Sequence, residues 1–142
     1  MDIILAPDVY VNASVALRSA PDKVVQRILG DRKGECKTTE WVLERIRAML
    51  GAVRSFKPEA VDNQIALIRD LVQVIEAPGD HDASDWEGAL VAAAKAAGAK
   101  RVVTDHPDLL EKSVSGDIEF ISTDGWLVES SLPPPPPPPK EK

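Results

Sequence analysis

Residues 86–110 read WEGALVAAAKAAGAKRVVTDHPDLL, and this stretch decides the fold. Its first part is rich in alanine, carries apolar residues at helical spacing and ends at Gly98. A short β-branched strand follows over residues 101–104, and polar and acidic residues come directly after it. A helix that leads into a buried strand is typical of an open α/β sheet, in which ligands bind at the strand tips.

Outward from this stretch, strand patterns alternate with helical patterns along the chain. The sequence predicts strands at 3–6, 35–38, 101–104 and 118–122. It predicts a first helix that starts at 12 or 14 and ends at 18, and further helices at 24–29, 40–50, 58–76, 86–97 and 108–112. A short closing turn is expected at 126–128. Residues 32–34 are predicted to be a loop, and Ser84 or Asp85 to cap the alanine-rich helix. We therefore expect an α/β fold, a three-layer α/β/α sandwich of Rossmann type with a central, mainly parallel sheet.

Length and composition indicate one globular domain. The chain has 142 residues, of which 44% are apolar and 28% charged. No apolar run approaches the ~20 residues that span a bilayer, and the single Cys36 excludes an internal disulfide, so we expect a cytoplasmic protein without membrane contact. The folded domain is expected over residues 1–132. Residues 133–142 begin with seven prolines and are expected to form an extended, disordered tail, either a spacer or a ligand for a proline-binding groove.

Charge is distributed unevenly about the net value of −6. Residues 18–57 hold ten Lys or Arg and five Asp or Glu, whereas residues 58–132 hold five and fifteen. The basic part is compatible with contacts to phosphate and the acidic part with a metal-binding cluster. The alternative is that both are solvated surfaces whose charges cancel where they pack.

Carboxylates occur at the positions where an α/β sheet gathers its ligands. Asp8 follows the first strand, and Asp105 follows the strand that ends at Thr104. Further candidates lie at or near helix starts: Glu44, Asp85, Glu87 and Asp108. Each also has a structural interpretation, because an acid after a strand forms turns, an acid at a helix start caps it, and Glu44 lies opposite an apolar stripe.

In order and spacing these residues resemble the PIN domain, an α/β nuclease fold that includes toxins of bacterial toxin–antitoxin pairs. The resemblance covers roughly residues 2–128. It rests on an apolar strand ending in an Asp with a Ser six residues on (Asp8, Ser14), a Glu in a helix after a Thr pair, an acid near the helix before the fourth strand, and VVTDHPDL at 102–109. The chain departs from the family where Val9-Tyr10 replace Thr-Asn, where Asp105 comes one residue early, and where Asp85 is shifted.

The resemblance implies a metal-dependent ribonuclease. Its catalytic residues are Asp8, Glu44, Asp85 and Asp105, and these four together with Asp108 hold Mg²⁺ or Mn²⁺, which prefer carboxylate oxygens and activate water. RNA lies along the basic surface of residues 23–57. An antitoxin or another protein is the implied partner, and homodimers are common in the family.

Two other interpretations compete with the ribonuclease. The departures from the family pattern favour a catalytically degenerate PIN-like module that binds proteins. A receiver-type or nucleotide-binding domain is disfavoured, because the acidic pair of a receiver and a glycine-rich phosphate loop are both missing from the sequence.

Overall fold

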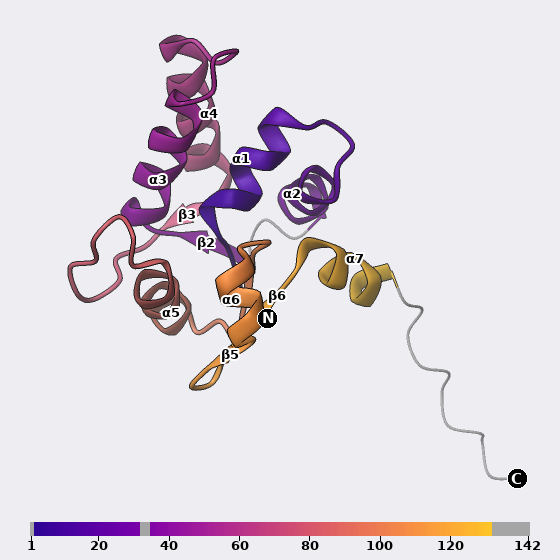
Figure 1. The fold of residues 1–142 in the computed structure, drawn as a ribbon, viewed down its shortest axis with the longest axis vertical. Helices are drawn as coiled ribbons and strands as arrows, with labels where there is room; N and C mark the ends of the chain where they lie inside the picture. Colours follow the sequence, from indigo (N-terminus) through magenta and orange to yellow (C-terminus); the bar gives the residue numbers. More distant parts are fainter. Residues whose placement is uncertain (1, 32–34, 132–142) are drawn as a thin grey trace, which may run out of the picture.

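A computed structural model describes residues 2–31 and 35–131, and it has an α/β/α architecture (Figure 1). The predicted 32–34 loop and the polyproline tail lie outside these residues. The strands are β1 (Ile3–Leu5), β2 (Cys36–Thr38), β3 (Gln73–Val74), β4 (Arg101–Val103), β5 (Val114–Ser115) and β6 (Ile118–Ile121). The helices are α1 (Pro7–Val15), α2 (Ala20–Asp31), α3 (Glu40–Gly51), α4 (Pro58–Leu71), α5 (Trp86–Ala97), α6 (Pro107–Lys112) and α7 (Thr123–Ser131).

The sheet has the strand order β3-β2-β1-β4-β6-β5. All neighbours pair in parallel except β5 and β6, which form an antiparallel hairpin. The mainly parallel sheet predicted from the sequence is therefore confirmed. The central strands are buried: Ile4, Leu5, Val102 and Val103 are all fully enclosed, as expected when helices cover both faces of a parallel sheet.

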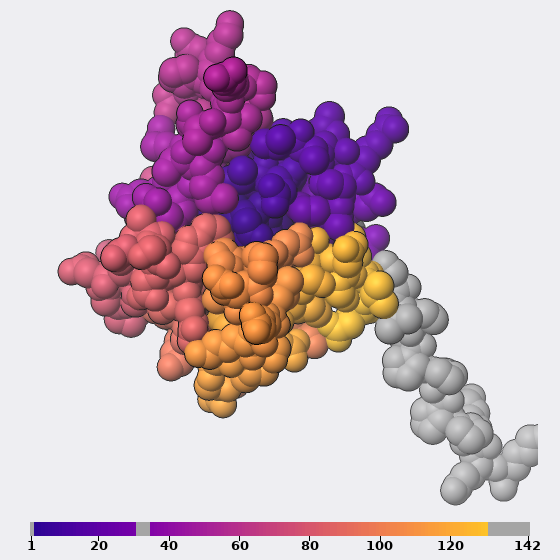
Figure 2. Space-filling view, in the orientation of Figure 1, coloured from indigo at the N-terminus to yellow at the C-terminus, as the bar shows by residue number. Residues whose placement is uncertain are grey.

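Helix α5 packs closely on the centre of the sheet. Its buried face consists of Ala89, Leu90, Ala93, Ala94 and Ala97, and it contacts β1 and β4. The small side chains bring the helix backbone near the strands, as the alanine pattern predicts. Helices α3 and α4 lie side by side and stand out from the rest of the molecule next to α1 and α2 (Figure 2).

The predicted helix at 58–76 was wrong in its last five residues. Helix α4 ends at Leu71, the backbone is extended at Val72, and Gln73 and Val74 pair in parallel with Lys37 and Thr38 of β2. Helical spacing of apolar residues continues past the true end of the helix, and the β-branched side chains there prefer the extended backbone that the sheet edge offers.

Three other boundaries also differ from the prediction. Helix α1 begins at Pro7, well before 12, because proline is preorganised for the first helical position. Helix α7 runs from Thr123 to Ser131, where a short turn was expected. The short β5 strand, joined to β6 through Gly116 at φ 60°, was not predicted.

Gly98 ends α5 in the left-handed region at φ 72°, and its N–H bonds back to the last turn. A Cβ at this position meets nothing within 4 Å, so only backbone strain opposes a larger residue. We predict that Gly98→Ala lowers the free energy of unfolding by about 1–2 kcal/mol, measured by urea titration. Gly51→Ala is the control, because Gly51 has ordinary helical geometry and open space, and it is expected to be neutral or stabilising. Equal effects of the two substitutions would contradict the prediction.

Candidate active site

The candidate site lies where the connections from the two central strands diverge. From β1 the chain leads to β2 on one side, and from β4 it leads to β6 on the other. Such a switch point leaves a crevice beyond the carboxyl ends of the strands. Asp8 is in the first turn of α1, directly after β1, and Asp105 follows β4, so both carboxylates stand at this edge of the sheet.

A chain of hydrogen bonds fixes both side chains. The Thr104 hydroxyl donates to Asp8 Oδ1 at 2.9 Å, and the backbone N–H of Asp105 donates to Asp8 Oδ2 at 2.8 Å. Asp105 in turn accepts from the backbone N–H and the hydroxyl of Thr123, at 2.9 and 2.7 Å. The carboxylates thus connect the ends of β1, β4 and β6 and are held in single orientations.

Burial makes the charge on Asp8 costly. The residue is 8% exposed, and its partner Thr104 is fully buried. Desolvation raises the pKa of Asp8 above its ordinary value of 3.8, and the nearby charge of Asp105 raises it further, although the hydrogen bonds from Asp105 and Thr104 act in the opposite direction. A cation beside the pair would relieve both unfavourable effects.

The raised pKa predicts how stability depends on pH. The folded protein binds the Asp8 proton more tightly than the unfolded chain, so this contribution is complete below pH 3.8 and is lost as pH rises through the higher, folded value. We expect the free energy of unfolding of the metal-free wild type, relative to Asp8→Asn, to increase as pH falls from 7 towards 4. Urea titrations of the two proteins at several pH values measure this difference. A difference that is constant or shrinks as pH falls would contradict the prediction.

Glu44 is not among the hydrogen-bond partners of this pair. It is exposed on α3 and lines a cavity of about 360 Å³, which Asp8 and Asp105 do not line. Its neighbour on the helix, Glu40, forms a two-bond ion pair with Arg69 at 2.7 and 2.8 Å. Arg47, on the same helix, pairs with Asp62.

Asp85 caps α5. Its carboxylate accepts from the N–H of Gly88 at 3.0 Å and lies 3.1 Å from His81 Nδ1, and these bonds, that with His81 foremost, lower its pKa. Of the two predicted caps, Asp85 is therefore confirmed and Ser84 is wrong. Ser84 bonds to Asp82, and Glu87 binds Lys112 and Ser115.

Asp108 is exposed in the first turn of α6 and does not cap that helix. The cap is His106, whose Nδ1 accepts from the Asp108 N–H at 3.3 Å. The structure therefore links Asp8 and Asp105 directly through a hydrogen bond, whereas Asp85 caps α5 and Glu44 and Asp108 are exposed. Within residues 2–31 and 35–131, no three His, Cys, Asp or Glu side chains come close enough to hold a metal ion.

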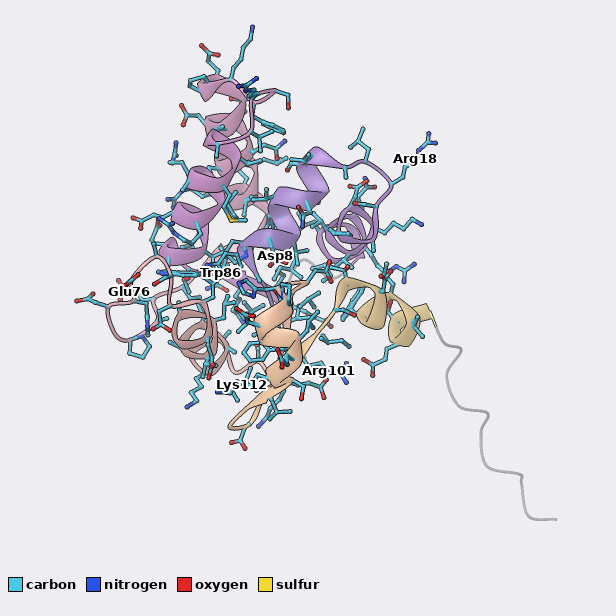
Figure 3. All side chains as sticks on the ribbon, in the orientation of Figure 1. Asp8, Arg18, Glu76, Trp86, Arg101 and Lys112 are labelled. Carbon is cyan, nitrogen blue, oxygen red and sulfur yellow. The ribbon has the colours of Figure 1, made fainter. Side chains whose placement is uncertain are left out.

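Two features of the site were not predicted. Thr104 and Thr123 orient the carboxylates, and their positions directly after β4 and β6 are the available sequence signal. In addition, Trp41, Trp86 and His106 form a row of rings (the ring row). Its centroid spacings are 6.0 Å between the indoles and 5.0 Å from Trp86 to His106. Figure 3 shows Trp86 close to Asp8 in projection.

Several of the described basic residues lie away from the acidic pair. Arg18, Lys23 and Arg27 line a shallow hollow at α2, and Figure 3 shows Arg18 pointing outward, well away from Asp8. Lys37 pairs with Asp2 at 2.9 Å. The predicted basic surface of residues 23–57 is thus divided among α2, β2, α3 and the segment that follows.

The mostly parallel sheet and the helices that cover it are consistent with a PIN-like α/β/α fold. Among solved structures, the chain is similar to one in the crystal structure of VapBC2 from Rickettsia felis bound to a DNA fragment from their promoter, with a TM-score of 0.62 over 86% of this chain and 98% of that chain. Sequence identity is 10%, so the likeness concerns the fold. No family model matches the sequence, and no curated protein matches it. In the described residues no helix is long and apolar enough to cross a membrane.

Proposed function

We propose that this chain is a metal-dependent ribonuclease of PIN type that hydrolyses RNA phosphodiesters. The observation that carries the proposal is the carboxylate pair Asp8–Asp105, held at the switch point of the sheet by Thr104 and Thr123. A buried carboxylate beside a second one is unfavourable by itself, and groups of this kind concentrate at functional sites.

The pair fits Mg²⁺ or Mn²⁺ in its donor chemistry. Such ions prefer hard oxygen ligands, keep several waters and are held in many proteins by one or two carboxylates together with substrate phosphate. Each oxygen of Asp8 and Asp105 accepts a hydrogen bond from a neighbouring residue, which leaves lone-pair capacity for a ligand bond. When bound, the ion supplies an activated water and charge neutralisation at the phosphate.

The residues around the pair keep the ligands in place. Thr104 and the Asp105 N–H prevent rotation of the Asp8 carboxylate, and Thr123 does the same for Asp105. Because the two carboxylates already have fixed orientations, their side chains lose little conformational freedom when metal and RNA bind. The proposal uses only Asp8 and Asp105 as ligands, since Glu44, Asp85 and Asp108 point to other contacts or to solvent.

Purified protein tests this proposal directly. We expect cleavage of single-stranded or structured RNA in Mn²⁺ and none in excess EDTA, followed on denaturing gels. Activity that persists in EDTA would exclude the metal mechanism, and no cleavage of any RNA in Mn²⁺ or Mg²⁺ would exclude the enzyme. The resemblance to VapBC2 also supports a protein partner of antitoxin type, which would be expected to suppress cleavage when added.

One observation favours a second function, a PIN-like module that binds proteins and does not cut RNA. The candidate acids Asp85 and Asp105 also act as structural caps, the first on α5 and the second on the start of α7. Calorimetric titration with Mn²⁺ separates the two functions. The nuclease requires saturable binding that Asp8→Asn removes, whereas the module predicts none up to millimolar metal.

A further inference from the structure

We propose that the cavity beside the carboxylate pair is a binding pocket for an unpaired guanine of the RNA substrate. This inference rests on the proposed function and names the substrate feature that the site would select. The cavity, of about 360 Å³, is lined by Trp41 and Ile75 and by Glu44, Glu76 and Asp80, among others.

The cavity lies on the same edge of the sheet as the carboxylate pair. Thr39 and Ile75, which line it, come directly after β2 and β3, whereas Asp8 and Asp105 follow β1 and β4. Neighbouring strands are about 4.8 Å apart, so the pocket and the pair are separated by roughly 10 Å along this edge. That distance is within reach of a nucleotide next to the one being cleaved.

The ring row extends from the cavity to the neighbourhood of the carboxylate pair. Trp41 belongs to the cavity wall, Trp86 packs edge to face against it, and His106, next to Asp105, contacts Trp86 with its ring tilted by 48°. The Trp41 indole N–H donates to the Asp82 carbonyl at 3.1 Å, which fixes the ring. Half-exposed aromatic rings in a row are the usual surface on which single-stranded bases stack, and stacking tolerates any base.

The acidic residues of the cavity would select guanine over the other bases. Glu44, Glu76 and Asp80 form no hydrogen bond or ion pair with any other described residue, whereas Glu40 is occupied by Arg69. A carboxylate accepts two parallel N–H bonds, and among the RNA bases guanine offers such a pair, its ring N1–H and its 2-amino group. A neutral base enters an acidic cavity without the repulsion that a phosphate would meet there.

The test is binding of three RNA pentamers, UUGUU, UUIUU and UUUUU, in EDTA so that no cleavage occurs. Inosine lacks only the 2-amino group. Quenching of tryptophan fluorescence is expected to give a dissociation constant for UUGUU that is at least about tenfold lower than for the other two. Trp41→Leu is expected to weaken binding of all three by about tenfold.

Two charge-matched triple variants identify the acceptors. E44Q/E76Q/D80N neutralises the cavity and is expected to bring the three dissociation constants within about twofold of one another. E59Q/D70N/E111Q neutralises three exposed acids outside the cavity and is expected to keep the guanine preference. Thermal melting of each variant verifies that it is folded.

Equal affinities of the wild type for the three pentamers would overturn the proposal, as would a guanine preference that survives in E44Q/E76Q/D80N. Saturable binding of an arginine-rich peptide in the cavity, without any base preference, would also overturn it by assigning the cavity to a basic protein side chain. Failure of the pocket and failure of the proposed function give different results. Guanine preference without Mn²⁺-dependent cleavage would contradict the nuclease function. Mn²⁺-dependent cleavage without guanine preference would contradict only the guanine pocket.

Discussion

Asp8→Asn is expected to reduce Mn²⁺-dependent RNA cleavage by more than about 100-fold. Loss of an outer-shell partner of a metal costs 10–100-fold in many sites, and loss of a charged ligand costs more. The effect on folding is smaller. An Asn keeps the bond from Thr104 but turns its amide towards the Asp105 N–H, at a cost of about 1–3 kcal/mol that is partly offset by removing a buried charge. Initial cleavage rates and circular dichroism measure the two effects.

Asp22→Asn is the matched control for this substitution. Asp22 is as buried as Asp8, at 8% exposure, and also bonds through both oxygens, but its partners are the Arg18 N–H and Gln26 near α2. We expect it to retain cleavage within a few fold of the wild type. Cleavage that survives in Asp8→Asn, or that is lost equally in both variants, would contradict the assigned site.

Asp105→Ala is expected to lower the free energy of unfolding by about 2–3 kcal/mol. The substitution removes the carboxylate that accepts two hydrogen bonds from Thr123, and it leaves the first N–H of α7 without its partner. Trp126, which is buried in the core from this helix, would be held less firmly. Urea titration measures the loss.

Two further variants define the cause of that loss. Thr123→Val removes only the hydroxyl bond and is expected to cost about 1–2 kcal/mol. Asp124→Ala removes an exposed acid from the same turn, where only the helix dipole acts, and is expected to cost about 0.3–1 kcal/mol. If Asp105→Ala is no more destabilising than Asp124→Ala, the link between β4 and α7 does not stabilise the fold as described.

The central sheet was predictable because its determinants are local. Residues 86–104 predict the alanine-rich helix, its end at Gly98 and the strand that follows. The structure has all three, with a boundary shift of one residue. The edge strand β3 was not predictable by the same reasoning. Its two residues lie between Val72 and Ile75, which continue the helical spacing of α4, and only pairing with β2, more than thirty residues away, makes them a strand.

The site was predictable only in part, for a related reason. Asp8 and Asp105 follow neighbouring parallel strands, so topology alone brings them together. Glu44 and Asp85 are placed by helix rotation and by local caps, and sequence order does not reveal which way such side chains turn. The structural roles of Thr123 and of the ring row depend on segments far apart in the chain, and no spacing rule relates them.

The most direct measurement is a crystal structure of the protein soaked in Mn²⁺, with the ion located by its anomalous scattering. We expect one Mn²⁺ at the switch point, about 2.1 Å from one oxygen of Asp8 and one of Asp105, with waters in the remaining positions. An ion bound elsewhere, or no ion between these carboxylates at millimolar Mn²⁺, would contradict it.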